Sequence, residues 1–201
     1  VATDYGLFEL HDNRFDKVVL AGGTKDDAAL FDDVQEADDY LLLKQYDAHN
    51  MVQDVFLIHR STKKVSRITT GAHVYTMTQV PAHNVLLLTT SKGMKTYDLQ
   101  AAYAGLAKEC PLPELYKPLS TLPFSSIVFD PQGNLWAYSA TTVYKLDVAG
   151  RLQVFDGANG LHVTSITKVH VDRENVLWIL TDGSGIVKLA NRNVEIVTGL
   201  F

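Results

Sequence analysis

Short apolar runs separated by turn residues recur along this sequence. Residues 176–181 form a continuous apolar run, which is typical of a strand buried on both faces. Residues 165–171 before it alternate between apolar and polar positions, and residues 182–185 after it form a turn whose glycines allow positive φ. Two more short strands are predicted at residues 186–190 and 194–198. The pattern therefore predicts four strands within about 40 residues and no long helix.

The stretch before this one repeats the same order. Trp136 and Trp178 are 42 positions apart, and each follows an aspartate by six positions, Asp130 and Asp172. Four short strands in a repeat of this length predict a β-propeller blade, a small sheet that is stable only when it stacks on its neighbours. Both tryptophans are predicted to fill the wedge between blades as packing residues rather than as ligand platforms. The strands predicted for the earlier copy are residues 126–130, 134–139, 142–147 and 152–156.

Two weaker copies extend the repeat toward the N-terminus. Residues 84–90 superpose on residues 175–181, with Leu87 at the tryptophan position, and residues 39–44 fit as a degenerate strand of the same kind. We therefore predict an all-β chain, a single propeller segment of about four blades of four antiparallel strands plus a partial one. The approximate blade bounds are 1–23 for the partial blade and then 24–70, 71–123, 124–161 and 162–201.

Two segments break the pattern. Residues 24–36 are rich in aspartate and glutamate, and we predict an exposed loop or a short helix between blades. Residues 99–122 begin with an alanine-rich stretch and continue with several prolines. Here we predict one or two helical turns at residues 101–108, followed by an extended connection. The chain begins inside a predicted second strand and ends near a fourth, so we expect it to be a portion of a larger propeller.

Composition and charge narrow the range of partners. Of the 201 residues, 46% are hydrophobic and 20% are charged, which is typical of a globular protein. The net charge of −5 and the lack of a basic cluster argue against a nucleic-acid surface. The densest basic spot, Lys63–Lys64, is interpreted as a hairpin turn. No run of about 18 apolar residues is present, so no membrane segment is predicted in this chain.

The residue types that support catalysis or metal binding show no matching spacing. His162 and His170 are eight positions apart, but no further ligand completes a tetrahedral set, so no metal is predicted. Cys110 is the single cysteine and has no convincing histidine partner nearby. The sequence contains no nucleophile elbow, phosphate-binding glycine loop or kinase signature. We predict no catalytic residue, no cofactor and no enzyme activity.

Polar turns are the better candidates for function. Aspartates recur at equivalent turns, and their side chains are expected to cap backbone amides there: Asp4, Asp130, Asp172 and Asp182. Ligands of propellers are expected on the face formed by the loops between second and third strands and by the loops between blades. These loops supply the candidate ligand-binding residues Asp4, Tyr5, Ser91, Lys92, Thr141, Thr142, Asn159, His162, Asp182 and Ser184.

The two C-terminal copies share a motif of turn and strand residues. Residues 130–136 read Asp-Pro-Gln-Gly-Asn-Leu-Trp, and residues 177–186 read Leu-Trp-Ile-Leu-Thr-Asp-Gly-Ser-Gly-Ile. A Gly-Leu pair at residues 160–161 precedes the last copy. Together these residues resemble the two-component regulator propeller repeat, with Leu180 in place of the glycine that is usual in that family.

The resemblance is uneven along the chain. It is good over residues 124–201 and 1–15, because the N-terminal residues look like the same motif after its tryptophan. It is thin over residues 24–122, where Leu42 and Leu87 stand at the tryptophan position. Another propeller family therefore stays open for the middle blades, although the Gly-His and Trp-Asp pairs of WD40 repeats are absent from the sequence.

The resemblance implies a non-catalytic sensor segment in the periplasmic part of a membrane-anchored bacterial signalling protein. The output domain of such a protein is commonly a histidine kinase and sometimes a diguanylate cyclase. A small-molecule ligand such as an oligosaccharide is implied as well. The alternatives are a scaffold propeller that binds a protein partner, and a propeller lyase or glycosidase. A homodimer is also open, because association with another copy would cover exposed sheet edges.

Overall fold

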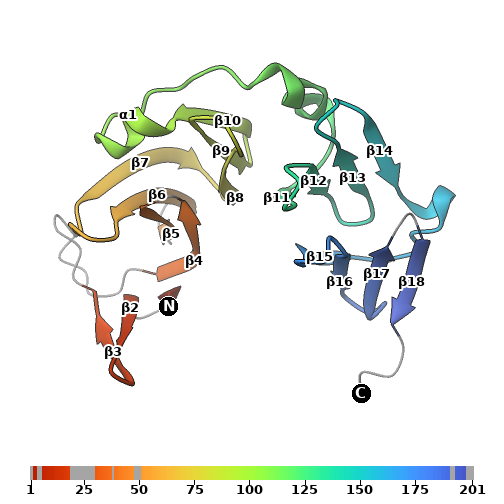
Figure 1. Cartoon of the computed structure of the whole chain (residues 1–201), viewed down its shortest axis with the longest axis horizontal. Coiled ribbons are helices and arrows are strands. Elements are labelled where there is room, and N and C mark those ends of the chain that lie inside the picture. The colour runs from red at the N-terminus through yellow and green to blue at the C-terminus, as the bar shows by residue number, and fades with distance from the viewer. Residues whose placement is uncertain are drawn as a thin grey trace. The chain divides into compact units, whose positions relative to one another are not determined.

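Short β-strands are the main elements in the described part of the protein. The structure is a computed structural model, and it describes residues 2–3, 6–18, 30–37, 39–47, 51–190 and 193–197. Within these residues the strands form small antiparallel sheets that follow one another in chain order (Figure 1). The chain divides into two compact units, Val1–Pro111 and Leu112–Phe201, and each unit has its own sheets and core.

The described part of the first unit contains three sheets. The first consists of β1 (Ala2–Thr3), β2 (Gly6–His11) and β3 (Arg14–Lys17). The second consists of β4 (Leu30–Ala37), β5 (Tyr40–Asp47), β6 (Val52–His59) and β7 (Val65–Ala72). The third consists of β8 (Val74–Gln79), β9 (Val85–Thr90) and β10 (Gly93–Asp98). The strands predicted at residues 39–44 and 84–90 are confirmed as β5 and β9.

Leucine-rich strands supply the core of the first unit. Leu42 and Leu88 join Met77 in the core between the second and third sheets. Leu43, the next residue along β5, packs instead with Leu7 between the first and second sheets. Because successive side chains of a strand point to opposite faces, one leucine run serves two sheet interfaces. Dense packing is reached here without a tryptophan.

The second unit contains two four-stranded sheets after the 3₁₀ helix η1 (Glu114–Thr121). The first sheet consists of β11 (Ser126–Phe129), β12 (Leu135–Tyr138), β13 (Val143–Leu146) and β14 (Leu152–Phe155). After the short 3₁₀ helix η2 (Gly157–Asn159), the second consists of β15 (Ile166–Val171), β16 (Leu177–Thr181), β17 (Ile186–Ala190) and β18 (Asn193–Val197). The predicted strands are confirmed here to within one residue at each end.

One apolar cluster joins the two sheets of the second unit. Trp136 and Val143 from the first sheet pack with Val169, Ile179 and Val187 from the second. The tryptophan is 5% exposed, so the prediction that it fills the wedge between neighbouring blades is confirmed. This interface gives each small sheet the apolar partner that it cannot provide for itself.

The prediction for the acidic segment is corrected. Residues 30–37 form β4, which pairs with β5 along its whole length, rather than a loop or a helix. Phe31 and Ala37 are buried, whereas Glu36 is exposed, so the strand contributes apolar side chains to the core and keeps the Glu36 carboxylate in water. Residues 24–29 lie outside the described residues.

The insertion after β10 also differs from its prediction. The helix α1 spans Leu99–Tyr103, so it begins two residues before the predicted start and ends five residues before the predicted end, and η1 occupies part of the predicted extended connection. The helix begins at Asp98, whose carboxylate accepts a hydrogen bond from the Ala101 amide at 2.9 Å. It lies beside β7 (Figure 1), where Ser66 Oγ donates to the carbonyl of Tyr103 at 3.2 Å. Neither this helix nor any other in the described ranges is long and apolar enough to cross a membrane.

The same insertion completes the third sheet. Glu109 forms an isolated β-bridge with Tyr97, and the Cys110 amide donates to the carbonyl of Thr96 at 3.0 Å. This sheet therefore departs from the four-strand pattern. The short segment around Glu109 and Cys110, which pairs with β10, occupies the position of the outer strand. In the second sheet, Lys63 and Lys64 lie in the hairpin between β6 and β7, as predicted.

Candidate functional site

The aspartate and tryptophan that define the repeat are hydrogen-bonded to each other. In β12, the indole Nε1–H of Trp136 donates to Asp130 Oδ2 at 3.1 Å. The other carboxylate oxygen of Asp130 accepts from the amides of Gln132 at 3.0 Å and Asn134 at 2.8 Å. The six-residue spacing therefore joins the turn before the strand to a side chain in the strand.

The last sheet repeats this arrangement. Trp178 Nε1–H donates to Asp172 Oδ2 at 2.8 Å, and Asp172 Oδ1 accepts from the amides of Glu174 and Val176, both at 2.9 Å. The hydrogen bond from Trp178 is the main cause that lowers the pKa of Asp172, followed by the Val176 amide. The prediction that these aspartates cap their turns is confirmed. Their bond to the tryptophan was missed, although the conserved spacing between the two copies was its signal.

A lysine from the next strand completes each motif. Lys145 Nζ lies 4.7 Å from the ring centre of Trp136, and Lys188 Nζ lies 5.9 Å from that of Trp178. In each motif the lysine ammonium group lies over the face of the indole, and the aspartate accepts a hydrogen bond from the indole Nε1–H at its edge. Trp136 is therefore a packing residue, as predicted, whereas Trp178 is partly exposed and the same prediction is not confirmed for it. The candidate site is built instead from polar loops.

Three loops of the second unit meet at one edge of its sheets. The Ile166 amide donates to the carbonyl of Ala140 at 2.6 Å, and the Asp182 amide donates to that of Ser165 at 2.8 Å. Thr164 Oγ1 donates to the carbonyl of Asp182, also at 2.8 Å. These bonds tie the β12–β13, β14–β15 and β16–β17 connections together. The edge carries the predicted site residues Thr141, Thr142, Asn159, His162, Asp182 and Ser184.

Some of these predicted residues also form hydrogen bonds to backbone groups. Asn159 Nδ2 donates to the carbonyl of Val154 at 2.6 Å, and its Oδ1 accepts from the Asp156 amide at 2.8 Å. Ser184 Oγ accepts from the amide of Thr164 at 3.4 Å. Thr141 and His162 are exposed. The edge is thus a hydrogen-bonded frame with polar side chains on its surface.

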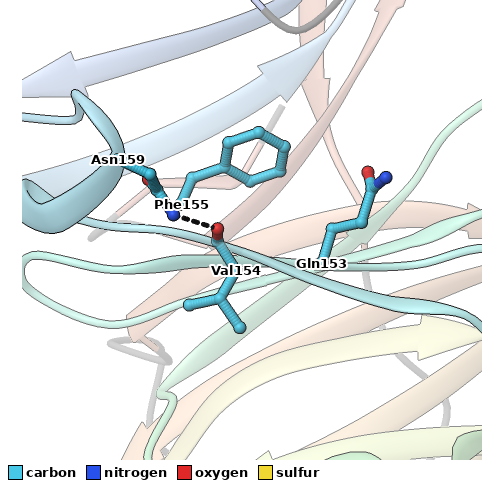
Figure 2. Close-up of a pocket in the computed structure, with 4 residues that line it drawn as sticks. All are labelled: Gln153, Val154, Phe155 and Asn159. Atoms are coloured by element: carbon cyan, nitrogen blue, oxygen red, sulfur yellow. Dashed lines mark hydrogen bonds between the residues drawn. The ribbon is translucent and has the colours of Figure 1, made fainter.

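A shallow depression adjoins this frame on the outer strand β14. Gln153, Val154, Phe155 and Asn159 line it. Figure 2 shows Gln153 and Phe155 extending from the same side of the strand, Val154 extending from the other side, and Asn159 bonded to the Val154 carbonyl. The alternation gives the depression one amide and one aromatic side chain on the same side.

The first unit builds the corresponding edge and shares one backbone hydrogen bond with that of the second unit. Ser91 and Lys92 lie in the β9–β10 turn, where the Ser91 amide donates to the carbonyl of His73 at 2.8 Å. Ser91 Oγ accepts from the His73 amide at 3.2 Å, and Lys92 Nζ donates to the carbonyl of Gly71 at 2.7 Å. The Ser91–His73 pair corresponds to the Asp182–Ser165 pair of the second unit. The other two predicted residues, Asp4 and Tyr5, lie outside the described residues.

An aromatic side chain that sequence reasoning missed lies at this edge. The register between β8 and β9 shifts between Val74 and Thr76, which leaves Tyr75 as the extra residue of a β-bulge. Its side chain is 42% exposed, and its ring contacts that of His73 edge to face at 4.9 Å. The buried ammonium of Lys44 donates to the carbonyls of Val74 and Tyr75 at 3.3 and 3.4 Å. A tyrosine in an alternating strand carries no sequence signal that it will be bulged outward.

The described residues give little support to metal or thiol chemistry. No group of three or more histidine, cysteine, aspartate or glutamate side chains in the described ranges is placed to hold a metal ion. Burial raises the pKa of the Cys110 thiol, which disfavours the reactive thiolate. The edge of the first unit offers hydroxyls, one ammonium group and an exposed aromatic ring, and these groups are suited to binding a polar ligand.

Comparison with solved structures identifies the fold. The extracellular domain of BT4673 from Bacteroides thetaiotaomicron, described as a hybrid two-component system, is 16% identical with a TM-score of 0.59, covering 86% of this chain and 25% of that one. PorZ from Porphyromonas gingivalis is 14% identical with a TM-score of 0.64, covering 95% and 31%. The gluconolactonase XC5397 from Xanthomonas campestris is 13% identical with a TM-score of 0.63, covering 89% and 63%.

The protein folds as β-propeller blades. The predicted fold class is therefore confirmed, and the resemblance to two-component regulator propellers agrees with the sensor domain among these structures. Identities this low show the fold alone. The chain spans a quarter of the BT4673 domain and less than two thirds of the gluconolactonase. A comparison with protein-family models found no match, and a comparison with curated protein sequences found none either.

Proposed function

We propose that the chain is a non-catalytic, ligand-binding propeller segment of a bacterial two-component-type signalling protein. The likeness that carries this proposal is the one to the extracellular domain of BT4673, which extends over 86% of the chain. A second sensor, BT3049, supports it with a TM-score of 0.52 over 82% of the chain. Such a segment belongs on the outer side of the cytoplasmic membrane, in the periplasm, as part of a membrane-anchored sensor.

The ligand that we propose is a small polar molecule such as an oligosaccharide. The edge of the first unit offers Ser91 and Lys92 beside the exposed ring of Tyr75. A sugar has hydroxyl groups for the polar side chains and a face of C–H bonds that can stack on an aromatic ring. The second unit offers hydroxyls of its own at the equivalent edge, from the predicted residues Thr141 and Thr142.

Thermal denaturation against a panel of oligosaccharides, peptides and metal salts tests this proposal. A ligand that binds only the folded state raises the midpoint of unfolding, and the stabilisation grows with the logarithm of the ligand concentration above Kd. We expect stabilisation by at least one oligosaccharide and its loss in Tyr75→Ala. Thr167→Ala is the matched control, because Thr167 is the extra residue of the corresponding bulge in β15. A panel without any stabilising compound would contradict ligand sensing.

Two other activities are favoured by particular likenesses. PorZ is described as a surface component of the type-IX secretion system, so a protein-binding scaffold is the second candidate. Capture of a specific partner by a chain that no small ligand stabilises would support it. The gluconolactonase likeness makes a hydrolase the third candidate, which steady-state turnover of glucono-lactone by the purified chain would support.

A further inference from the structure

The outer strand β14 has one edge that no described strand pairs with. Among the described strands, β14 pairs with β13 alone. At the start of this pairing, the Asp147 amide donates to the carbonyl of Arg151 at 3.1 Å. Backbone groups alternate in direction along an antiparallel strand, so every second residue after Arg151 also faces β13. Leu152 and Val154 therefore direct their amides and carbonyls away from the sheet.

A side-chain amide already occupies part of this edge. Asn159 Nδ2 donates to the carbonyl of Val154 at 2.6 Å, and Asn159 Oδ1 accepts from the Asp156 amide at 2.8 Å. These are bonds of the kind that the backbone of a neighbouring strand would make. Three outward groups before them have no hydrogen-bond partner among the described residues, namely the amide and carbonyl of Leu152 and the amide of Val154. The free edge can therefore accept a short extended backbone.

The side chains of β14 give this edge two different sides. Leu152 and Val154 are each 39% exposed, and they lie on the same side of the strand because they are two positions apart. Gln153 and Phe155 lie on the other side, where they line the depression (Figure 2). The ring of Phe155 stacks on that of Trp136 at 6.1 Å, so packing inside the unit positions it. A strand added here would place alternate side chains against the two aliphatic residues and in the depression.

Two sheets of the first unit show what their outer edges accept. The helix α1 lies beside β7, the fourth strand of the second sheet. At the edge of the third sheet, β10 pairs with a segment that is not a regular strand. There the Asp98 amide donates to the carbonyl of Lys108 at 2.9 Å, and the Cys110 amide donates to that of Thr96 at 3.0 Å. Two backbone hydrogen bonds thus accompany a short segment added to a sheet of this protein, and β14 offers three groups.

We propose that β14 binds an extended segment of a partner protein, which joins the sheet β11–β14 as a fifth strand. The outward backbone groups recognise another backbone, so this part of the pairing is independent of the partner's sequence. The side chains of β14 supply selectivity, because the partner needs apolar residues at the alternate positions that lie against Leu152 and Val154. Burial of these two side chains adds to the hydrogen bonds. The proposal goes beyond ligand sensing and holds whichever ligand the polar loops bind.

Amide hydrogen exchange of the chain without a partner, followed by NMR, tests whether this edge is open. The amides of Gln153 and Phe155 face β13 and should exchange slowly, whereas those of Leu152 and Val154 should exchange about ten times faster or more. Slow exchange at Leu152 and Val154 overturns the proposal, because the edge would then be covered within the chain. Protection that appears only as the chain concentration rises also overturns it, since the occupant would then be a second copy.

Selection of displayed linear peptides on the purified chain tests the binding itself. We expect enriched peptides with apolar residues at every second position, and an added peptide should slow exchange at the amides of Leu152 and Val154. Val154→Pro removes one outward N–H and no bond to β13, so the sheet should remain folded while the affinity falls by about tenfold or more. Val154→Ile is the matched control, because it keeps the N–H and an apolar side chain and should keep the affinity.

Methylation of the peptide's own amides gives a readout that needs no protein variant. In an added strand, one amide faces β14 and the next faces away from the sheet. We therefore expect a selected peptide to lose affinity only when alternate amides carry the methyl group. A library that yields no binder overturns the proposal. Binders that Val154→Pro holds as tightly as the unchanged chain, or that lose affinity at consecutive positions, overturn it too.

Discussion

The sheets β11–β14 and β15–β18 share a local plan, and they differ in what surrounds it. In both, an aspartate caps the turn before the second strand and accepts a hydrogen bond from the indole of a tryptophan. A lysine paired with that tryptophan on the next strand covers the ring. Trp136 is buried under the neighbouring sheet, whereas Trp178 is partly exposed. The motif is therefore formed whether or not its ring is buried by another blade.

This difference separates two contributions to stability, the hydrogen bonds within the motif and the burial of the tryptophan ring. The hydrogen bonds of the motif join residues six positions apart, so they form within one sheet. Burial of the ring depends on a second sheet that the motif does not contain. Substitutions that remove a local hydrogen bond should therefore lower the free energy of unfolding equally in the two sheets. Substitutions that remove packing should lower it more in the sheet whose tryptophan is buried.

Removal of each indole should give the largest difference. Trp136→Ala leaves a cavity between two packed sheets, and we expect it to lower the free energy of unfolding by about 3–5 kcal/mol. Trp178→Ala removes the same local bond from a partly exposed site, and we expect a loss of about 1–2 kcal/mol. Chemical denaturation followed by circular dichroism measures both. Equal losses would show that the covering sheet contributes little.

Removal of the buried cap should have the next largest effect. Asp130→Ala leaves the amides of Gln132 and Asn134 and the indole of Trp136 without their acceptor. Because buried donors without partners are costly, we expect a loss of about 2–3 kcal/mol in the free energy of unfolding. In the double variant with Trp136→Phe, part of this loss should disappear, and a fully additive result would contradict the indole bond.

The cap of the exposed motif should be visible in the pH dependence of stability. The hydrogen bond from Trp178 lowers the pKa of Asp172 below its usual value of 3.8. The ionised carboxylate therefore stabilises the folded state above that value, and this contribution is lost as the pH falls through the lower folded pKa. Asp172→Asn should reduce the acid-induced loss of stability, measured by urea denaturation between neutral pH and about pH 2. Trp178→Phe should reduce it in the same direction.

The lysines should give the smallest effect. Lys145 lies closer to its indole than Lys188 does, at 4.7 against 5.9 Å. We expect Lys145→Met to lower the free energy of unfolding by about 0.5–1 kcal/mol and Lys188→Met to lower it by about 0.5 kcal/mol or less. The conservative change Lys145→Arg should retain most of the contribution. A larger loss at Lys188 than at Lys145 would contradict the order that the two distances predict.

The candidate site contains residues that could be predicted from the sequence and one that could not. Ser91, Lys92, Asp182 and Ser184 were correctly placed in turns between strands, because glycine, serine and aspartate mark such turns. Tyr75 was not found, since its exposure comes from a register shift against β9. A bulge changes the direction of one side chain without changing the apolar and polar pattern of its strand.

The middle of the chain was the hardest part to predict. The second and third sheets lack the aspartate–tryptophan motif, and Leu42 and Leu87 are buried in its place. Their packing depends on residues far away in the chain, such as Leu7 against Leu43. The acidic strand β4 was missed for the same reason, because its pairing with β5 prevails over the weak strand preference of aspartate and glutamate.

The sequence by itself determined the positions of the strands in residues 126–197 to within one residue, and the turns capped by Asp130 and Asp172. These features rest on apolar periodicity and on hydrogen bonds between residues close in the chain, which any sequence of this pattern can form. Only the tertiary structure decided which tryptophan is buried, how Glu109 replaces an outer strand, and that Tyr75 faces solvent. Those outcomes depend on contacts between sheets and on strand register, and a local sequence pattern specifies neither of them.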